Sequence, residues 1–159
     1  SAQAQSDVDL FKRDRGRTIA MPLPVMAPPP LQACVVRAEQ KYQVPACILR
    51  AIHQIESGGS HRPGLMRSNT NGTRDYGVTQ INTVWMRYFN QKFGITAHQI
   101  TSNSCLAIHA AAYVVRFEIN ASGDFWMGVG RYHSRTPARR DRYLRRAAAL
   151  AQQFGCTLR

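Results

Sequence analysis

The chain has 159 residues, enough for one domain with a real hydrophobic core and too few for two comfortable ones. Its 44% hydrophobic and 19% charged residues are ordinary for a globular protein, but 21 Lys+Arg against 9 Asp+Glu give a net charge of +12. No apolar run approaches the roughly 20 residues of a membrane span, and the charge favours an anionic neighbour without selecting nucleic acid, acidic lipid or cell-wall glycan.

Residues 1–30 differ in composition from the rest. A charged stretch at residues 12–17 precedes a proline-rich stretch at residues 21–30, and proline cannot donate the backbone hydrogen bonds of a helix or sheet. We expect a disordered Pro/Arg-rich leader over residues 1–30, or alternatively an arginine-rich segment that grips a partner. A single domain is expected over residues 31–159. The chain begins without a hydrophobic signal region, so a secretion signal is either already removed or absent.

The domain reads as mostly helical. Residues 31–42 have a helical pattern, and Pro45 suits the first turn of a second helix. Residues 58–82 are instead rich in Gly, Asn, Ser and Thr, and Asn71-Gly72 is a hairpin turn signal. Helical patterns then resume at residues 83–93, 103–120, 124–134 and 137–154. The sequence therefore predicts a mostly α (α+β) domain with one small β-hairpin or ordered loop.

One carboxylate stands at the end of the second predicted helix. Leu49, Ile52 and Glu56 are spaced i, i+3 and i+7, so Glu56 shares the face of the apolar stripe. Partial desolvation there would raise the pKa of Glu56, as a general acid near neutral pH requires. The alternative is a polar helix end that turns to solvent, since Ser57-Gly58-Gly59 marks a stop.

Two later segments complete a pattern with Glu56-Ser57. Gly77-Val78-Thr79-Gln80-Ile81-Asn82 follows about two dozen residues on, and a segment containing Tyr132 comes late in the domain. The set resembles the lytic transglycosylases with a soluble-transglycosylase or goose-lysozyme-like fold, over about residues 31–154. The match is closest to the small specialised members that accompany conjugation, type IV secretion and pilus machines. The resemblance implies a lysozyme-like single domain with its β-hairpin insert after the catalytic helix.

The resemblance also implies roles for individual residues. Glu56 would be the catalytic acid/base, and Tyr132 would lie near enough to hydrogen-bond it. Gly77 would allow close backbone approach in the glycan groove. The residues implied to bind substrate are Ser57, Gly77, Gln80, Asn82, Tyr132 and His133. The sequence departs from the family's commonest Tyr-Asn-x-Gly pattern, because His133 follows Tyr132.

A second carboxylate, Asp75, lies directly before the glycan-binding segment. Hen-type lysozymes use a second carboxylate on a β-hairpin after the catalytic helix, and Asp75 is similarly placed in sequence. Opposite Glu56 it would be a second catalytic residue that stabilises an oxocarbenium-like transition state, with the separation deciding the glycosidase geometry. Alternatively, Asp75 pairs with Arg74 or caps a turn.

The implied reaction is cleavage of the β-1,4 bond between N-acetylmuramic acid and N-acetylglucosamine. Glu56 donates a proton to the leaving oxygen and then accepts one from the muramoyl 6-hydroxyl, which closes a 1,6-anhydro ring. No cofactor is implied.

The alternatives are a muramidase of the same fold and a non-catalytic wall-binding scaffold of a secretion system. The expected protein is periplasmic, with peptidoglycan as substrate and components of a secretion, conjugation or pilus complex as partners; no nucleic acid is expected, because no binding motif is recognisable.

The four cysteines, Cys34, Cys47, Cys105 and Cys156, are even in number and widely spaced, without the C-x-x-C pair of a zinc or redox motif. Two disulfides in an exported protein are therefore expected. The resemblance implies that Cys34 pairs with Cys105, which leaves Cys47 with Cys156, although four cysteines allow three connectivities. No His/Asp/Glu spacing indicates a metal site.

The last predicted helix has two distinct faces. Tyr143, Ala147, Leu150, Ala151 and Phe154 form its apolar stripe. Its arginines, from Arg139 to Arg146, usually indicate a solvated face. They could also hold the protein against anionic peptidoglycan, an effect that salt would weaken.

Overall fold

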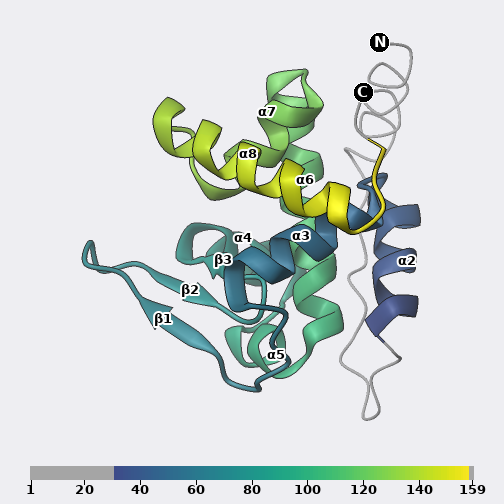
Figure 1. Ribbon diagram of the computed structural model, residues 1–159. Helices are drawn as coiled ribbons and strands as arrows, with labels where there is room; N and C mark the ends of the chain where they lie inside the picture. The colour runs from purple at the N-terminus through teal and green to yellow at the C-terminus, as the bar shows by residue number, and fades with distance from the viewer. Residues whose placement is uncertain (1–30, 158–159) are drawn as a thin grey trace.

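The computed structural model describes residues 31–157, which form seven helices and one three-stranded sheet (Figure 1). The expected leader at residues 1–30 lies outside the described residues. The elements in chain order are α2 (Leu31–Tyr42), α3 (Ala46–Ser57), β1 (Met66–Ser68), β2 (Arg74–Tyr76), β3 (Ile81–Asn82), α4 (Thr83–Phe93), α5 (Ala97–Ser102), α6 (Ser104–Ser122), α7 (Phe125–His133) and α8 (Pro137–Gln153). The predicted mostly α class with a small β insert after the second helix is confirmed.

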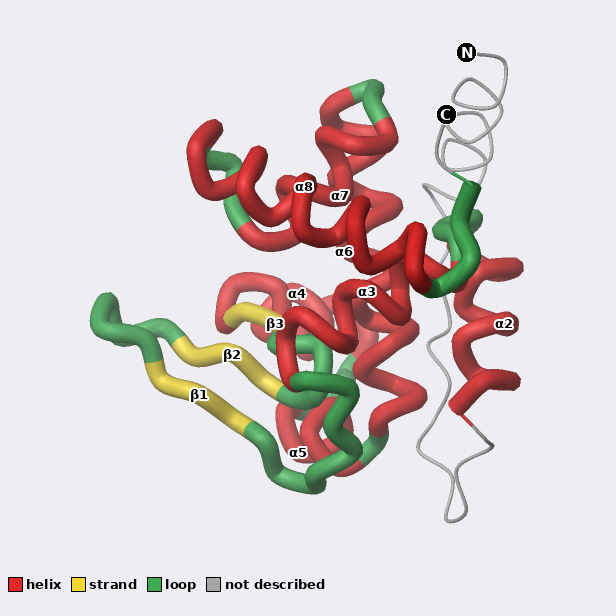
Figure 2. Tube along the Cα trace, in the orientation of Figure 1, coloured by secondary structure: helices red, strands yellow, loops and turns green. Residues whose placement is uncertain are grey.

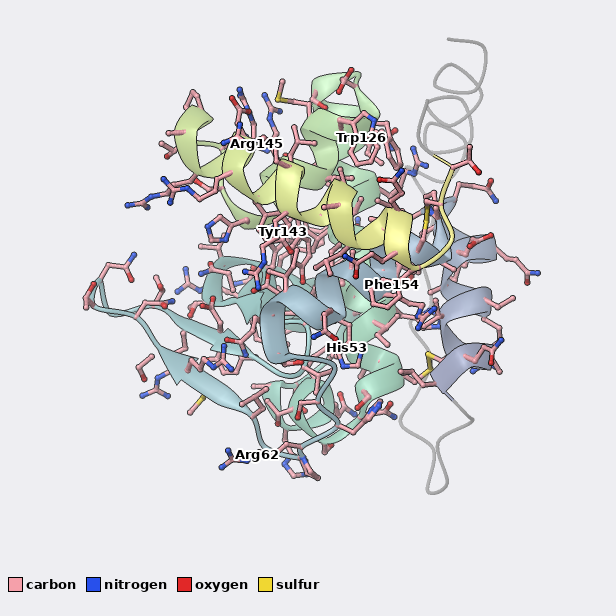
Figure 3. All side chains as sticks on the ribbon, viewed as in Figure 1. His53, Arg62, Trp126, Tyr143, Arg145 and Phe154 are labelled. Carbon is pink, nitrogen blue, oxygen red and sulfur yellow. A yellow bond between two sulfur atoms is a disulfide. The ribbon has the colours of Figure 1, made fainter. Side chains whose placement is uncertain are left out.

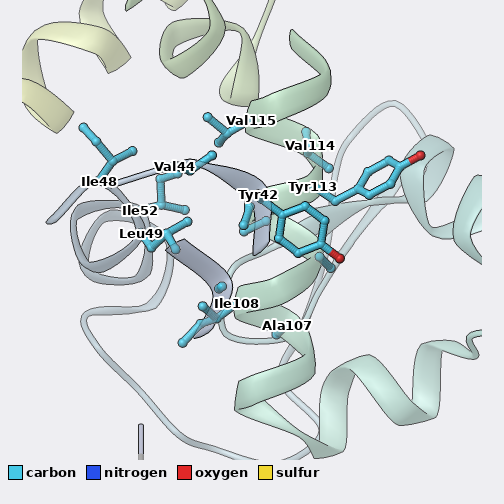
Figure 4. Packing of buried hydrophobic residues seen from close by; sticks show 14 of the residues in the cluster. Tyr42, Val44, Ile48, Leu49, Ile52, Ala107, Ile108, Tyr113, Val114 and Val115 are labelled. Atoms are coloured by element: carbon cyan, nitrogen blue, oxygen red, sulfur yellow. The ribbon is translucent and has the colours of Figure 1, made fainter. Parts of the chain in front are cut away.

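Helix α6 forms the centre of the core. Most of its residues are buried, on every side of the helix, which is expected of a helix that is apolar all round. Helices α2, α3, α5 and α7 pack against it. Figure 4 shows Leu49 and Ile52 of α3 facing Ile108 and Val115 of α6 in one buried cluster. The core therefore fixes α3 rigidly against α6.

The insert after α3 is an antiparallel sheet with strand order β1-β2-β3. Its register pairs Met66 with Tyr76 and Asp75 with Asn82. The predicted hairpin is confirmed, and the short strand β3 adds to it. Figure 2 shows the turn between β1 and β2 projecting away from the helices. The end of α3 therefore lies between this sheet on one side and helices α7 and α8 on the other (Figure 1).

Within residues 31–157, the structure contains one helix that the pattern did not predict, α5. Its six residues are too few to show a helical period in the sequence. Thr96 and Gln99 form a capping box at its start, which is the local signal that could have indicated it. The other helices begin and end within a few residues of their predicted bounds.

Both disulfide pairs implied by the resemblance are present. Cys34 and Cys105 join α2 to the start of α6, with their Cα atoms 5.6 Å apart. Cys47 and Cys156 join the first turn of α3 to the segment after α8, with a Cα separation of 5.8 Å. The second bond therefore ties the start of α3, the helix that carries Glu56, to the segment that follows α8.

Among residues 31–157, no helix has the length and apolarity needed to cross a bilayer.

Candidate active site

Glu56 lies in the last turn of α3, on the side that the apolar stripe predicted. Leu49 and Ile52 are buried in the core, and Glu56 on the same face is half-buried at the edge of a cleft. Gly58 ends the helix in a left-handed conformation with φ +66°, and its N–H donates to the carbonyl of Gln54. The helix stop therefore comes two residues after Glu56 and holds its side chain at the helix end.

The surroundings of Glu56 raise the pKa of its carboxyl from 4.5 to about 7. Burial is the main cause, because a charged carboxylate loses hydration there. The hydroxyl of Tyr143 donates to Oε2 of Glu56 at 2.8 Å and acts in the opposite direction by favouring the charged form. The charge of Asp75 raises the pKa further, whereas those of Arg67 and Arg146 lower it. Glu56 is thus balanced between its two protonation states near neutral pH.

The tyrosine that hydrogen-bonds Glu56 is Tyr143 of α8, and the expectation that Tyr132 would do so is wrong. The hydroxyl of Tyr132 donates instead to the carbonyl of Thr79, at 2.5 Å. Figure 3 shows Tyr143 between α8 and α3. The sequence placed Tyr143 only in the apolar stripe of the last helix, and this buried position is what brings its hydroxyl against α3.

The ring of His133 lies at the cleft with Glu56, against the ring of Tyr143. The two rings are stacked, with centroids 5.1 Å apart and planes at 5°. Burial lowers the pKa of His133, and the charge of Arg139 lowers it further. A neutral imidazole at this position can donate a hydrogen bond to a sugar and accept one from it.

The segment from Gly77 to Asn82 is held tightly against the core. The hydroxyl of Thr79 donates to the carbonyl of Ala107 on α6 at 2.8 Å, and Nε2 of Gln80 donates to the carbonyl of Gly77 at 2.9 Å. Gln80 itself has a positive φ of 55°, a conformation that is strained for a residue with a side chain. These bonds fix the turn that places Gln80 in the cleft.

Gly77 and Ser57 hold the 77–82 segment in place, and neither residue lines the cleft. A Cβ atom on Gly77 would lie 3.1 Å from the carbonyl oxygen of Ile100 on α5. The close approach expected at Gly77 is therefore to α5 instead of to a glycan. The hydroxyl of Ser57 donates to the carbonyl of Val78 at 2.7 Å, so it ties the end of α3 to the 77–82 segment and does not contact the carboxylate of Glu56.

An open cleft of about 520 Å³ lies between α3, the sheet and α7. The residues predicted from the sequence that line it are Glu56, Asp75, Gln80, Asn82, Tyr132 and His133. The structure thus brings six predicted site residues together and places Ser57 and Gly77 behind them. Asn82 also caps α4 by accepting from the N–H of Val84, which fixes its side chain at the cleft edge.

Asp75 lies on β2 and is held by two amide donors. Nδ2 of Asn69 donates to one of its oxygens at 3.2 Å, and Nδ2 of Asn82 to the other at 3.4 Å. Among residues 31–157, no ion pair joins Asp75 to Arg74; the backbone N–H and carbonyl of Arg74 bond to the hydroxyl of Thr83. The carboxylate of Asp75 therefore has a fixed orientation on the same cleft as Glu56.

Two features at the site were not assigned from the sequence. Trp85 packs against Phe117 at 5.0 Å between ring centroids, but it is only half-buried and also lines the cleft. Arg67 of β1 donates to the backbone carbonyl of Glu56 at 3.0 Å. Neither position belongs to a recognisable motif, so only the fold reveals them.

In the described part of the chain, one group of side chains has the spacing of metal ligands, but its chemistry does not suit a metal. That group contains Cys34, Cys105 and His109. Because its two cysteines are joined in a disulfide, their sulfurs are not available as thiolate ligands.

A carboxyl that exchanges protons near neutral pH, at the edge of a long polar cleft, suits cleavage of a glycosidic bond. The placement of this cleft, between a helical body and a small sheet, is that of the lysozyme-like glycan-cleaving enzymes. Comparison with known families agrees, because the family model described as the transglycosylase SLT domain matches residues 33–153. The chain belongs to this family and is a lytic transglycosylase that acts on peptidoglycan.

Curated relatives share most of their length with this chain. Protein IpgF of Shigella flexneri is 29% identical over 122 residues, which cover 76% of this chain and 78% of that protein. Invasion protein IagB of Salmonella typhimurium is 30% identical over 115 residues, which cover 72% of this chain and 70% of that protein. The similarity therefore spans the domain that carries the cleft.

Proposed function

We propose that this enzyme cleaves the bond between N-acetylmuramic acid and N-acetylglucosamine and leaves a 1,6-anhydro muramoyl end, with Glu56 as both acid and base. The observation that carries the proposal is the pKa of about 7 of Glu56 at the edge of the cleft. One carboxyl that must first give and then take a proton works best when both of its forms are accessible at the working pH.

The proposed reaction balances without water. Protonated Glu56 gives its proton to the glycosidic oxygen as the bond from that oxygen to the muramoyl C1 breaks. The muramoyl O6 then forms a bond to C1, and its proton passes to the Glu56 carboxylate, which restores the acid. Tyr143 holds Oε2 of Glu56, so it stabilises the transient carboxylate and leaves Oε1 for the substrate.

The cleft supplies polar groups for the sugars on either side of Glu56. Gln80, Asn82 and His133 present amide and imidazole groups to it, which suit the hydroxyl and N-acetyl groups of the glycan. Trp85 offers part of an indole face at the same wall, a surface on which an apolar sugar face can stack.

The test is digestion of purified sacculi followed by mass analysis of the new glycan ends. Wild type should produce anhydro ends, and Glu56→Gln should lose at least about a hundredfold in rate, the usual contribution of a general acid. Asp141→Asn is the matched control, because it removes one negative charge at a side chain paired with Arg140, outside the cleft. An active Glu56→Gln enzyme would overturn the assignment of Glu56.

A muramidase that admits water is the second candidate, and Asp75 is the observation that favours it. Asp75 lines the same cleft, and its charge raises the pKa of Glu56. If Asp75 only exerts this field, Asp75→Asn lowers the pKa of Glu56, moves the activity profile toward acid pH and leaves anhydro products. If Asp75 takes part in hydrolysis, wild type gives reducing ends and the variant loses about a hundredfold or more in rate.

We also propose that the enzyme works in the periplasm and opens the wall locally for a secretion, conjugation or pilus complex. Two disulfides suit an oxidising compartment, and peptidoglycan lies there. Cells lacking the protein should regain assembly of the machine with wild type and not with Glu56→Gln. Equal rescue by both would favour the wall-binding scaffold.

A further inference from the structure

A second, smaller cleft of about 250 Å³ lies beside Glu56, against α8. Three exposed arginines line it, at positions 139, 142 and 146. Their spacing of i, i+3 and i+7 puts them on one face of the helix. We call this feature the arginine cleft, defined by Arg139, Arg142 and Arg146.

The fold does not neutralise these three charges. Within residues 31–157, no carboxylate forms an ion pair with any of them, whereas nearby Arg140 pairs with Asp141 at 2.8 Å and Arg135 pairs with Glu118 at 2.9 Å. The cleft therefore presents three guanidinium groups to solvent, and the carboxyl among its lining residues is that of Glu56.

The proposed acid chemistry does not explain these charges either. The charge of Arg146 lowers the pKa of Glu56 and so opposes the protonated acid. Arg139 and Arg142 both act against protonation of His133. An anion bound between the arginines would offset this opposing field, which points to a ligand.

The chemistry of peptidoglycan identifies the anion. Its glycan backbone is neutral, whereas the peptide stem on each muramoyl residue carries carboxylates. The arginine cleft shares Glu56, His133 and Arg139 with the main cleft, so a stem on a muramoyl residue beside Glu56 has a continuous path into it. Guanidinium groups bind carboxylates with charge-assisted, often paired hydrogen bonds.

We infer that the arginine cleft binds carboxylates of the peptide stem on the muramoyl residue at the cleavage site, and so makes the enzyme prefer stem-bearing glycan. This specificity role rests on the proposed function. Glycan without stems would leave the arginines unpaired. The preference is therefore the difference in binding free energy between stem-bearing and stem-free glycan.

The test compares two substrates: soluble peptidoglycan strands with intact stems, and the same strands stripped of stems by an amidase. Arg142→Gln is the main variant, since Arg142 lines the arginine cleft but not the main cleft and is not among the charges that shift the pKa of Glu56. Arg145→Gln is the matched control. Arg145 lines neither the main cleft nor the arginine cleft, and Figure 3 shows it on the side of α8 that faces away from α3.

Wild type should cleave stem-bearing strands with a kcat/KM about tenfold higher than stripped strands, the size of one good charge-assisted contact. Arg142→Gln should lose most of this ratio, through the stem-bearing substrate alone. Arg145→Gln should keep the ratio of wild type.

Other outcomes overturn the inference and are distinguishable. Equal cleavage of both substrates by wild type removes the stem role but leaves the proposed function intact, whereas cleavage of neither rejects the proposed function itself. If Arg142→Gln loses the same activity on both substrates, the arginines provide only general charge attraction. The same conclusion holds if Arg145→Gln also lowers the ratio between the substrates. Loss of binding to anionic phospholipid vesicles by Arg142→Gln, with an unchanged substrate ratio, assigns the cleft to a membrane surface.

Discussion

The hydrogen bond between Tyr143 and Glu56 joins two residues 87 positions apart in the sequence. Burial raises the pKa of Glu56, and the Tyr143 hydroxyl partly offsets that rise by favouring the carboxylate. The hydroxyl of Tyr143 therefore adjusts the pH at which Glu56, the proposed catalytic acid, titrates.

The first prediction concerns Tyr143→Phe. In wild type, kcat/KM should fall as the pH rises through about 7, because the protonated acid is lost. Removing the hydroxyl removes an influence that lowers the pKa of Glu56, so the fall should move to higher pH. The rate at the optimum should also drop by about tenfold, because the transient carboxylate loses a donor. A pH series on soluble peptidoglycan fragments measures both, and an unmoved alkaline limb would contradict the assignment.

The second prediction concerns stability. The folded-state pKa of Glu56 is raised from 4.5 to about 7, so the folded protein binds this proton more tightly than the unfolded chain does. The resulting cost is absent below pH 4.5, grows between pH 4.5 and 7, and reaches about 2–3 kcal/mol above pH 7. Glu56→Gln should remove it and unfold at higher urea concentration than wild type at pH 8, with little difference at pH 4. A difference of equal size at both pH values would argue against a buried, titrating carboxyl.

Some features of the site could be predicted from the sequence and others could not. The half-buried position and raised pKa of Glu56 were predictable, because a carboxyl on an apolar helical stripe is a local pattern. Tyr143 was not, because an aromatic residue in a stripe reads the same whether or not its hydroxyl meets a partner on another helix. Gly77 was singled out, but only the fold shows that Ile100 is what approaches it.

At the scale of elements, the contact between α6 and α7 depends on one glycine. A Cβ on Gly128 would lie 2.5 Å from the backbone nitrogen of Ile119, a distance that side chains in real structures do not reach. The backbone of α6 cannot retreat easily, because the helix is buried on every side. Helix α7, which carries Tyr132 and His133 to the cleft, is therefore set in place by this contact.

The third prediction follows from that contact. Gly128→Ala should destabilise the protein by about 2–3 kcal/mol through overpacking, measured by urea unfolding. It should also reduce activity, because α7 shifts relative to the cleft. Gly123→Ala is the matched control at the end of α6, where a Cβ meets nothing within 4 Å and only the positive φ of 73° is strained, at about 1 kcal/mol. Equal losses at the two positions would show that close helix packing is not what Gly128 provides.

The elements themselves were predictable in proportion to their length. Helices α6 and α8 are long enough to show their periods and end near glycines. Helix α5 and strand β3 have six and two residues, so neither shows a period, and each depends on contacts made after the chain has folded. The outline of the fold could thus be read from the sequence, while the short pieces that shape the cleft could not.

At the scale of the whole molecule, the charge of +12 and the two disulfides suit an enzyme that works on an anionic, extracytoplasmic polymer. The glycan contacts proposed for Gln80, Asn82 and His133 are short-range, whereas the attraction between a basic protein and an anionic wall acts over the Debye length. That length shrinks from about 10 Å at 0.1 M salt to about 3 Å at 1 M. The two contributions to wall binding should therefore respond differently to salt.

The last prediction uses this difference. Binding of the Glu56→Gln variant to intact sacculi, which it should not digest, is expected to weaken by about tenfold or more between 0.05 M and 0.5 M NaCl. On sacculi stripped of peptide stems, the wall loses its stem carboxylates, so the remaining affinity should be lower and depend less on salt. Pelleting assays at several salt concentrations measure both slopes. Equal slopes on the two walls would mean that stems are not the anions that attract the protein, whereas salt-independent binding to intact sacculi would place the whole affinity in the neutral contacts of the cleft.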